Sequence, residues 1–384
     1  MTRFAFVTWD GGGNTPPAIG IAQELQQRGH EVVFLGYAAQ RKHFEKQGLV
    51  FKTLRRSGSF DIYQAREPAK RIAGLMARVW ACPEHLDDIP DALEETSADA
   101  LVIDFMMQGA LAAAARLSIP VAVVAHSSIA GLIPPPESPI GAARLAATNR
   151  LREKAELSAL TRLNDGWAGY PTLVATIPEL DPAAAYADPS VRYVGPIFER
   201  FPNMDCDSPW EAGDDRPLVL VSFTTTGLWD QRGRIRNTLD ALCDESVRVL
   251  VTAAHLEDIG VIPANAVIRS FVSHAAVLPS AAVTVTHAGH GTVSASLAHG
   301  VPIVALPNAA ADQPFLAARL QQLDAGLALD GEAKPDVIRL AVRAAMTQPL
   351  YAAAAKRLAI AIQDAPGVSG AVTELERLAL ATSA

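Results

Sequence analysis

The sequence predicts an α/β protein built from two doubly wound halves, each with a parallel sheet. Short, wholly apolar and β-branched runs alternate with helical stretches over most of the 384 residues. Apolar strands of this kind are typical of parallel sheets whose two faces are covered by helices. Hydrophobic residues make up 49% of the chain but aromatic residues only 6%, as expected where Ala, Val and Leu pack helices onto strands.

The first half opens with a strand, a helix and a second strand. Pro16 suits the first turn of the helix, because its missing N–H would have no partner there, and Gly29 provides the stop. The expected elements are a strand at 4–9, a helix at 16–28, a strand at 31–36, a strand at 100–103, a helix at 108–117 and a strand at 119–125. This repetition predicts neighbouring parallel strands.

Two segments, 55–95 and 129–165, break this rhythm. Both are helical in pattern and mixed in polarity, and the second contains a run of three prolines. Segments inserted after strands often shape a binding cleft or a lid. A helical packing layer is an equally consistent interpretation.

The halves are joined by a polar stretch. Residues 198–215 hold two prolines, one glycine and six acidic residues and show no apolar periodicity, which indicates a linker. We expect an N-terminal domain at 1–200, a linker at 201–216, a C-terminal domain at 217–366 and a last helix at 367–384 that crosses back to the N-terminal domain. A cleft between the carboxyl ends of the two sheets is expected to bind ligands.

The second half restarts the alternation. The expected elements are strands at 218–223, 247–253, 267–271, 282–286 and 301–306 and helices at 232–243, 290–299 and 312–323. Their number and spacing predict a second parallel sheet.

Charge and cysteine content exclude several classes of function. The net charge is −8 without a basic stripe, which argues against general nucleic-acid binding or an anionic membrane surface. Cys82, Cys206 and Cys243 are too few and too scattered for a disulfide scaffold or a zinc site. The N-terminal apolar run is too short for a signal peptide, and no stretch resembles a membrane span. We therefore expect a cytoplasmic protein, monomeric or homodimeric.

The most specific motif lies at the end of the strand at 282–286. His287 ends this strand, and Gly289 and Gly291 then turn the chain into a helix at about Thr292. Exposed backbone N–H groups and the positive end of a helix dipole form a natural diphosphate site. His287 and the Thr292 hydroxyl can donate to the same oxygens.

Further elements follow at fixed intervals and carry a family resemblance. Gly300-Val-Pro302 and Asp312-Gln313 come after the motif, and Phe271-Val272 precedes it. This stretch resembles the donor-binding signature of the family-one glycosyltransferases of GT-B fold. It is most similar to the bacterial enzymes that modify natural products such as antibiotics. The resemblance implies two Rossmann-like domains facing across a cleft.

The resemblance also implies a role for each matched residue. Phe271 and the Val272 backbone would hold the nucleobase, and Asp312 and Gln313 would bond the sugar hydroxyls. The diphosphate would be held by the following residues: His287, Gly289, His290, Gly291 and Thr292. Thr224 and Thr225, which follow the first C-terminal strand, would face the phosphates across the cleft. The co-substrate would be a UDP- or dTDP-sugar, with no metal and no other cofactor. The partner would be a small apolar or aromatic acceptor.

Three departures leave the nucleotide and the sugar open. Ala295 stands where plant members carry a glutamate for the ribose. The loop 308–311 is one residue longer than the pattern, and Ser273-His274 replaces Pro-Gln.

A fourth departure concerns the general base. Many members place a histidine in the turn after the first strand, where Asn14 stands here. An amide cannot accept a proton at neutral pH. His126, at the end of the strand at 119–125, is our first candidate for the base, and Asp10 is the second. Asp104 occupies the strand end where the family often keeps an aspartate that orients the histidine, although a strand-terminal cap is an equal alternative.

The function implied is inverting transfer of a sugar from a nucleoside diphosphate to the acceptor. Two alternatives remain. A sugar-nucleotide 2-epimerase shares the architecture but needs more acidic residues around the sugar than Asp312 alone. A catalytically silent helper that binds sugar nucleotides would explain Asn14 without a substitute base.

Overall fold

A computed structural model describes residues 1–64, 67–200, 210, 213–223, 231–253 and 259–381. The chain divides into two compact units, residues 1–200 together with 365–384 (unit 1) and residues 201–364 (unit 2). Most of the segment 201–216, which we expect to be a linker, lies outside the described residues.

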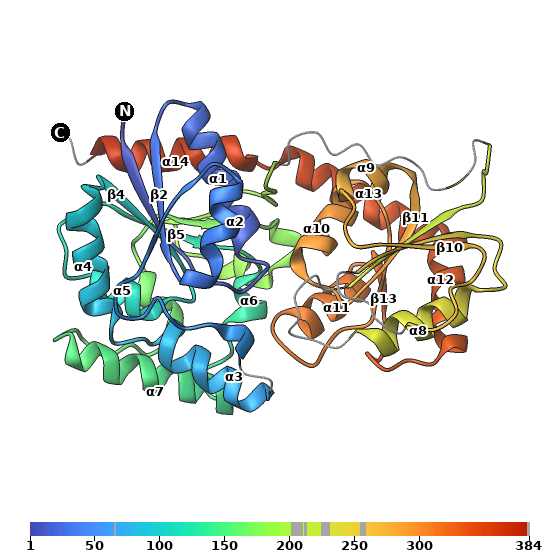
Figure 1. The fold of residues 1–384 in the computed structure, drawn as a ribbon, viewed down its shortest axis with the longest axis horizontal. Helices are drawn as coiled ribbons and strands as arrows, with labels where there is room; N and C mark the ends of the chain where they lie inside the picture. The colour runs from blue at the N-terminus through green and yellow to red at the C-terminus, as the bar shows by residue number, and fades with distance from the viewer. Residues whose placement is uncertain (65–66, 201–209, 211–212, 224–230, 254–258, 382–384) are drawn as a thin grey trace. The chain divides into compact units, whose positions relative to one another are not determined.

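Unit 1 contains a seven-stranded, wholly parallel sheet in the order β3-β2-β1-β4-β5-β6-β7 (Figure 1). The strands are β1 (Arg3–Val7), β2 (Glu31–Gly36), β3 (Val50–Thr53), β4 (Ala100–Asp104), β5 (Val121–Ala125), β6 (Thr172–Val174) and β7 (Val191–Tyr193). The central strands β4 and β5 are buried along their whole length. This position explains why the two sequences consist almost entirely of apolar residues, because neither face of a buried parallel strand is in contact with water.

The helices of unit 1 connect these strands and include the two inserted segments. They are α1 (Thr15–Gln27), α2 (Arg41–Lys46), α3 (Pro68–Leu75), α4 (His85–Thr96), α5 (Gln108–Ala114), α6 (Ile129–Leu132), α7 (Pro139–Lys154) and α14 (Gly367–Ala381), with a π-helical turn at Met76–Trp80. The start of α7 follows from its sequence. Pro139 occupies its first turn, and the Ser138 hydroxyl accepts from the backbone N–H of Gly141 at 3.1 Å.

Unit 2 contains a six-stranded parallel sheet in the order β10-β9-β8-β11-β12-β13. Its strands are β8 (Leu218–Ser222), β9 (Arg248–Thr252), β10 (Ala266–Arg269), β11 (Ala281–Thr286), β12 (Ile303–Ala305) and β13 (Gly326–Ala328). Its helices are α8 (Arg232–Leu242), α9 (His274–Val277), α10 (His290–Ala298), α11 (Gln313–Gln322), α12 (Pro335–Thr347) and α13 (Pro349–Asp364). The expectation of two doubly wound α/β halves is confirmed.

Strand order places the candidate residues within each unit. The order reverses between β1 and β4 in unit 1 and between β8 and β11 in unit 2. At such a reversal the connections leave in opposite directions, and a crevice opens beyond the carboxyl ends of the strands. Asp104 ends β4, and His287 follows β11 directly. Candidate residues of both units therefore lie at the reversal of their own sheet.

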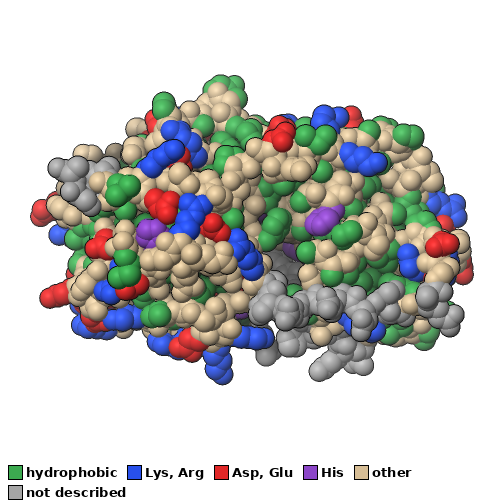
Figure 2. Space-filling view, turned by 90° about the horizontal axis from the view of Figure 1, so that it is seen from above, with side chains coloured by type: hydrophobic (Ala, Val, Ile, Leu, Met, Phe, Trp, Pro, Cys, Tyr) green, Lys and Arg blue, Asp and Glu red, His purple; other side chains and the backbone are tan. Residues whose placement is uncertain are grey.

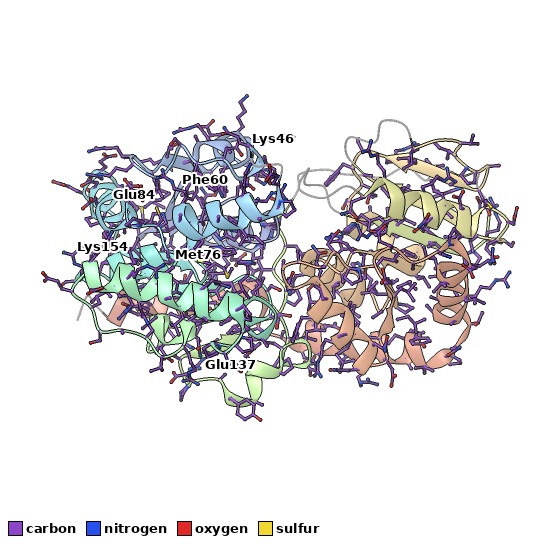
Figure 3. All side chains as sticks on the ribbon, turned by 90° about the horizontal axis from the view of Figure 1, so that it is seen from below. Lys46, Phe60, Met76, Glu84, Glu137 and Lys154 are labelled. Atoms are coloured by element: carbon purple, nitrogen blue, oxygen red, sulfur yellow. The ribbon has the colours of Figure 1, made fainter. Side chains whose placement is uncertain are left out.

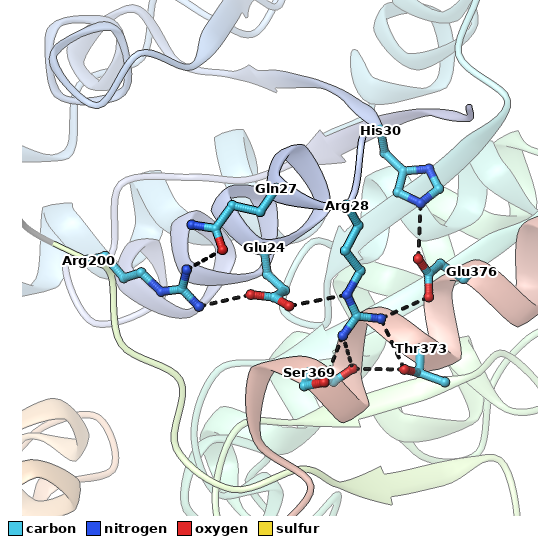
Figure 4. Close-up of polar contacts among 8 residues, drawn as sticks. All are labelled: Glu24, Gln27, Arg28, His30, Arg200, Ser369, Thr373 and Glu376. Carbon is cyan, nitrogen blue, oxygen red and sulfur yellow. Dashed lines mark hydrogen bonds and ion pairs between the residues drawn. The ribbon is translucent and has the colours of Figure 1, made fainter.

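The last helix, α14, packs on unit 1. Val372 and Leu375 are buried in the same core as Phe6 of β1. Arg28, at the end of α1, reaches α14 with one guanidinium nitrogen 2.9 Å from a carboxylate oxygen of Glu376 and another 2.7 Å from the Ser369 hydroxyl (Figure 4). Apolar burial and this polar cluster together attach the end of the chain to α1.

Figure 2 shows acidic and basic side chains interspersed over the face of unit 1 that it draws. Among the residues that the structure describes, no helix combines the length and the apolar character needed to cross a membrane.

Candidate functional site

His126 and Asp104 lie in contact at the carboxyl edge of the sheet of unit 1. Nδ1 of His126 is 2.7 Å from Oδ2 of Asp104, and both side chains are buried. The contact follows from the register of β4 and β5, in which Asp104 lies beside Val124, two residues before His126. A carboxylate can only accept a hydrogen bond, so Nδ1 carries the proton and donates it. The lone pair of the imidazole is then on Nε2, the nitrogen a general base would use.

Further hydrogen bonds fix this pair. The Trp9 indole N–H donates to Oδ1 of Asp104 at 3.1 Å, and the backbone N–H of Met106 donates to the same oxygen at 3.0 Å. Beyond His126, the buried carboxylate of Asp181 accepts from the backbone N–H groups of Ile129 and Ala130 at 2.8 and 3.1 Å. The carboxylate of Asp104 and the loop after His126 are therefore both held in place.

Asn14, at the position where the family places its histidine, makes its side-chain hydrogen bonds within the glycine-rich turn. Its Oδ1 accepts from the Gly11 N–H at 3.0 Å, and its Nδ2 donates to the Trp9 carbonyl at 2.7 Å and to the Thr8 hydroxyl at 3.3 Å. The side chain is buried. These contacts indicate that Asn14 shapes the turn.

Asp10, the second candidate for the base, lies in a different set of contacts. The Tyr63 hydroxyl donates to Oδ1 of Asp10 at 3.1 Å. Burial raises the pKa of Asp10 above its usual value, and the hydrogen bond from Tyr63 partly offsets this shift. A carboxylate with a raised pKa is a better proton acceptor than an ordinary one, so Asp10 remains a chemically sensible alternative to His126.

In unit 2 the diphosphate motif forms the start of α10. The helix begins at His290, as predicted for the helix at 290–299, so Gly291 and Thr292 lie in its first turn. The first N–H groups of a helix have no intrahelical acceptor and can bind an anion. A Cβ at Gly289 would lie 2.5 Å from Nε2 of His287. Glycine at this position therefore lets the imidazole lie against the start of the helix.

His287 is uncharged at neutral pH. Burial lowers its pKa to about 4, and the positive charge of Arg234 lowers it further. A neutral imidazole can still donate one hydrogen bond to a phosphate oxygen. An anion bound beside it would raise its pKa again.

Two polar residues of this region, Gln231 and Arg234, were missed by the sequence analysis. Gln231 occupies the N-cap position of α8, but its side chain does not cap the helix, and both polar atoms of this buried side chain have no hydrogen-bond partner among the described residues. Arg234 is about nine-tenths buried; a guanidinium nitrogen lies 3.2 Å from Glu332, and its Nε is buried and unpartnered within the described part of the chain. No motif marks these residues, since their burial depends on the fold.

Asp312 and Gln313, the pair predicted to bind the sugar, lie at the start of α11. Oε1 of Gln313 already accepts from the backbone N–H and the side-chain amide of Asn308, both at 2.9 Å. The longer loop that contains Asn308 closes with Ala311 in a left-handed conformation (φ 55°). Only the Nε2 group of Gln313 is then left for a sugar hydroxyl. Asp312 immediately precedes α11 and is largely buried.

The predicted nucleobase site has one exposed and one buried residue. Phe271 is 46% exposed, whereas Val272 is buried. His274, in place of the usual glutamine, has Nε2 at 3.2 Å from the Ser222 hydroxyl at the end of β8. Thr224 and Thr225, predicted to face the phosphates, lie outside the described residues. The described residues also contain no group of three or more His, Cys, Asp or Glu side chains suited to a metal ion.

Sequence comparisons relate this chain to enzymes of natural-product biosynthesis. Residues 236–378 match the family model described as the C-terminal domain of erythromycin biosynthesis protein CIII-like proteins. The chain is 29% identical to 4'-demethylrebeccamycin synthase of Lentzea aerocolonigenes, over 93% of this chain and 94% of the relative. It is 27% identical to demethyllactenocin mycarosyltransferase of Streptomyces fradiae, over 85% of this chain and 75% of the relative.

Among solved structures, the chain resembles CalG4, the calicheamicin glycosyltransferase. The TM-score is 0.80 with 21% identity, and the match covers 98% of each chain. At this identity the likeness concerns the fold, which is GT-B.

Proposed function

We propose that this chain, which belongs to the GT-B proteins related to natural-product glycosyltransferases, transfers a sugar from a nucleoside diphosphate sugar to a small apolar or aromatic acceptor. The observation that carries the proposal is the buried contact between His126 and Asp104, because it supplies the base that Asn14 cannot provide. Unit 1 would bind the acceptor and unit 2 the donor.

The proposed reaction is a single in-line displacement with inversion. The acceptor oxygen forms a bond to the anomeric carbon while the bond from that carbon to the diphosphate breaks. The electron pair of the broken bond stays on the diphosphate, and the acceptor proton passes to Nε2 of His126. The carboxylate of Asp104 stabilises the imidazolium that results, 2.7 Å from Nδ1.

The leaving diphosphate gains negative charge, which groups of unit 2 would stabilise. The first N–H groups of α10 and the Thr292 hydroxyl are suited to this role. We propose that Arg234 adds positive charge and that the unpartnered amide of Gln231 bonds the diphosphate or the sugar. These groups would allow transfer without a metal ion.

Product analysis tests the proposal against its alternatives. Purified protein is incubated with UDP- and dTDP-sugars and a panel of phenolic and alcoholic acceptors, and products are identified by mass spectrometry. Glycosylated acceptor together with acceptor-dependent release of nucleoside diphosphate is the expected result. A new sugar nucleotide formed without acceptor would indicate an epimerase instead. Binding of sugar nucleotides without turnover would indicate a helper protein.

A further inference from the structure

Arg144, on α7, is a buried cation for which the described residues provide no anionic partner. It is 4% exposed, and its guanidinium donates to the Leu132 carbonyl at 2.8 Å and to the Met106 sulfur at 3.4 Å. Its Cζ lies 4.6 Å from the centroid of the Trp80 ring. Among the described residues no carboxylate pairs with it. Burial lowers the pKa of Arg144 to about 10, so the side chain is still charged at neutral pH.

Such an arrangement is uncommon, because a buried charge is costly unless it is paired. A guanidinium has five N–H donors. One carbonyl, one weakly accepting thioether and one aromatic face therefore leave much of its hydrogen-bonding capacity unused. Trp80 adds to this surplus of donors, since its indole N–H is buried and has no partner among the described residues.

Arg144 is connected to the proposed base by two short routes. Met106 contacts the guanidinium through its sulfur and donates its backbone N–H to Asp104. Trp80 packs edge-to-face on Trp9, with ring centroids 6.3 Å apart, and the Trp9 indole also bonds Asp104. Figure 3 shows α7 passing beside the segment that begins at Met76 and ends at Trp80. The unused donors therefore belong to the same part of unit 1 as His126.

We propose that Arg144 and Trp80 form an acceptor subsite that binds an anionic oxygen group, such as a carboxylate, on an aromatic acceptor. This inference rests on the proposed function, because it places the acceptor beside His126. An anion would pair with the guanidinium and accept a hydrogen bond from the indole N–H of Trp80. The half-buried residues of α6 lie between His126 and Arg144 in the sequence, and the Leu132 carbonyl accepts from Arg144.

A matched pair of acceptors tests the subsite. The probes are 6-hydroxy-2-naphthoic acid and its methyl ester, which differ in charge but keep the same ring and hydroxyl. Binding is measured by calorimetry and transfer by product formation. Arg144→Met should weaken binding of the acid by about 10–100-fold, as expected when a hydrogen bond to a charged group is lost. Binding of the ester should change less than about twofold.

Two further variants distinguish an effect of the lost charge from an effect of misfolding. Arg150→Met removes an exposed arginine from the same helix and should change neither affinity. Trp80→Phe keeps an aromatic face under the guanidinium but removes the N–H, and should weaken binding of the acid by a smaller factor than Arg144→Met. This variant also tests the subsite if Arg144→Met does not fold.

The outcomes are distinguishable. Equal affinity of the wild-type protein for the acid and the ester, equal losses for both in Arg144→Met, or no binding of either would overturn the subsite. Glycosylation of other acceptors would leave the proposed function standing in each of these cases. Selective, Arg144-dependent binding of the acid with no transfer from any sugar nucleotide would instead contradict the proposed function.

Discussion

The substitution Asp104→Asn tests the proposed base with little change in shape. The side chain keeps an oxygen that can accept from the Trp9 indole and the Met106 N–H, now 3.1 and 3.0 Å from Oδ1 of Asp104. The other oxygen, 2.7 Å from Nδ1 of His126, becomes an NH2 group that can only donate. Nδ1 must then accept, and the proton of the imidazole moves to Nε2. The variant therefore removes the lone pair that would take the acceptor proton.

The size of the loss follows from the role of that lone pair. A positioned general base contributes about 10²–10⁴-fold to turnover, so kcat with an aliphatic alcohol should fall by a factor in this range. A phenol of low pKa ionises without help and should lose much less. Because the two residues act as one unit, Asp104→Asn combined with His126→Ala should be no slower than His126→Ala alone.

The assay is kcat for both acceptors, together with the affinity for nucleoside diphosphate by calorimetry. That affinity should be unchanged, because Asp104 lies in unit 1. Asp99→Asn, an exposed aspartate of the same unit that accepts from the Arg3 N–H, is the matched control. Full activity of a folded Asp104→Asn protein with the aliphatic alcohol would refute the mechanism and move the role to Asp10.

Four other predictions follow from the contacts. Binding of nucleoside diphosphate below neutral pH should be accompanied by proton uptake at His287, because the bound anion raises the pKa of this residue from about 4. Calorimetry in two buffers of different ionisation enthalpy measures the protons exchanged, and the uptake should be smaller in His287→Asn. Asp312→Asn should leave the affinity for nucleoside diphosphate nearly intact and abolish turnover, whereas equal losses in both would show a structural role. Leu375→Ala should lower the free energy of unfolding, measured in urea, by about 2–5 kcal/mol, because Leu375 is buried in the core of unit 1. Leu380→Ala, which alters an exposed side chain of the same helix, should lower it by less than about 0.5 kcal/mol. Asn14→His should lower the melting temperature without raising activity, because the amide it replaces makes three hydrogen bonds in the turn; a gain with aliphatic alcohols would contradict this interpretation.

Local patterns determined the fold class and the diphosphate motif of this protein. A buried parallel strand needs an apolar run, and a turn into a helix needs small residues, so both leave a signature in a few consecutive residues. The strand at 31–36 was predicted with its observed bounds, and the helix predicted at 290–299 begins at the same residue as α10. The strands β3, β6, β7 and β13 were missed, because each has only three or four residues, too few to show a period. The three-residue strand β12 was found only because it lies within the longer apolar run at 301–306.

The contacts of the candidate site were decided by the tertiary structure. Asp104 and His126 are 22 residues apart and meet because β4 and β5 are neighbours in register. Because neighbouring parallel strands end at the same edge of a sheet, the sequence predicts both residues at that edge. It does not predict which side chains are in contact. Arg144 and Trp80 lie on separate inserted segments that carried no motif at all. Their pairing depends on how distant helices pack, and so does the burial that leaves the guanidinium without an anion among the described residues. Packing is a property of the whole unit rather than of any stretch of its sequence.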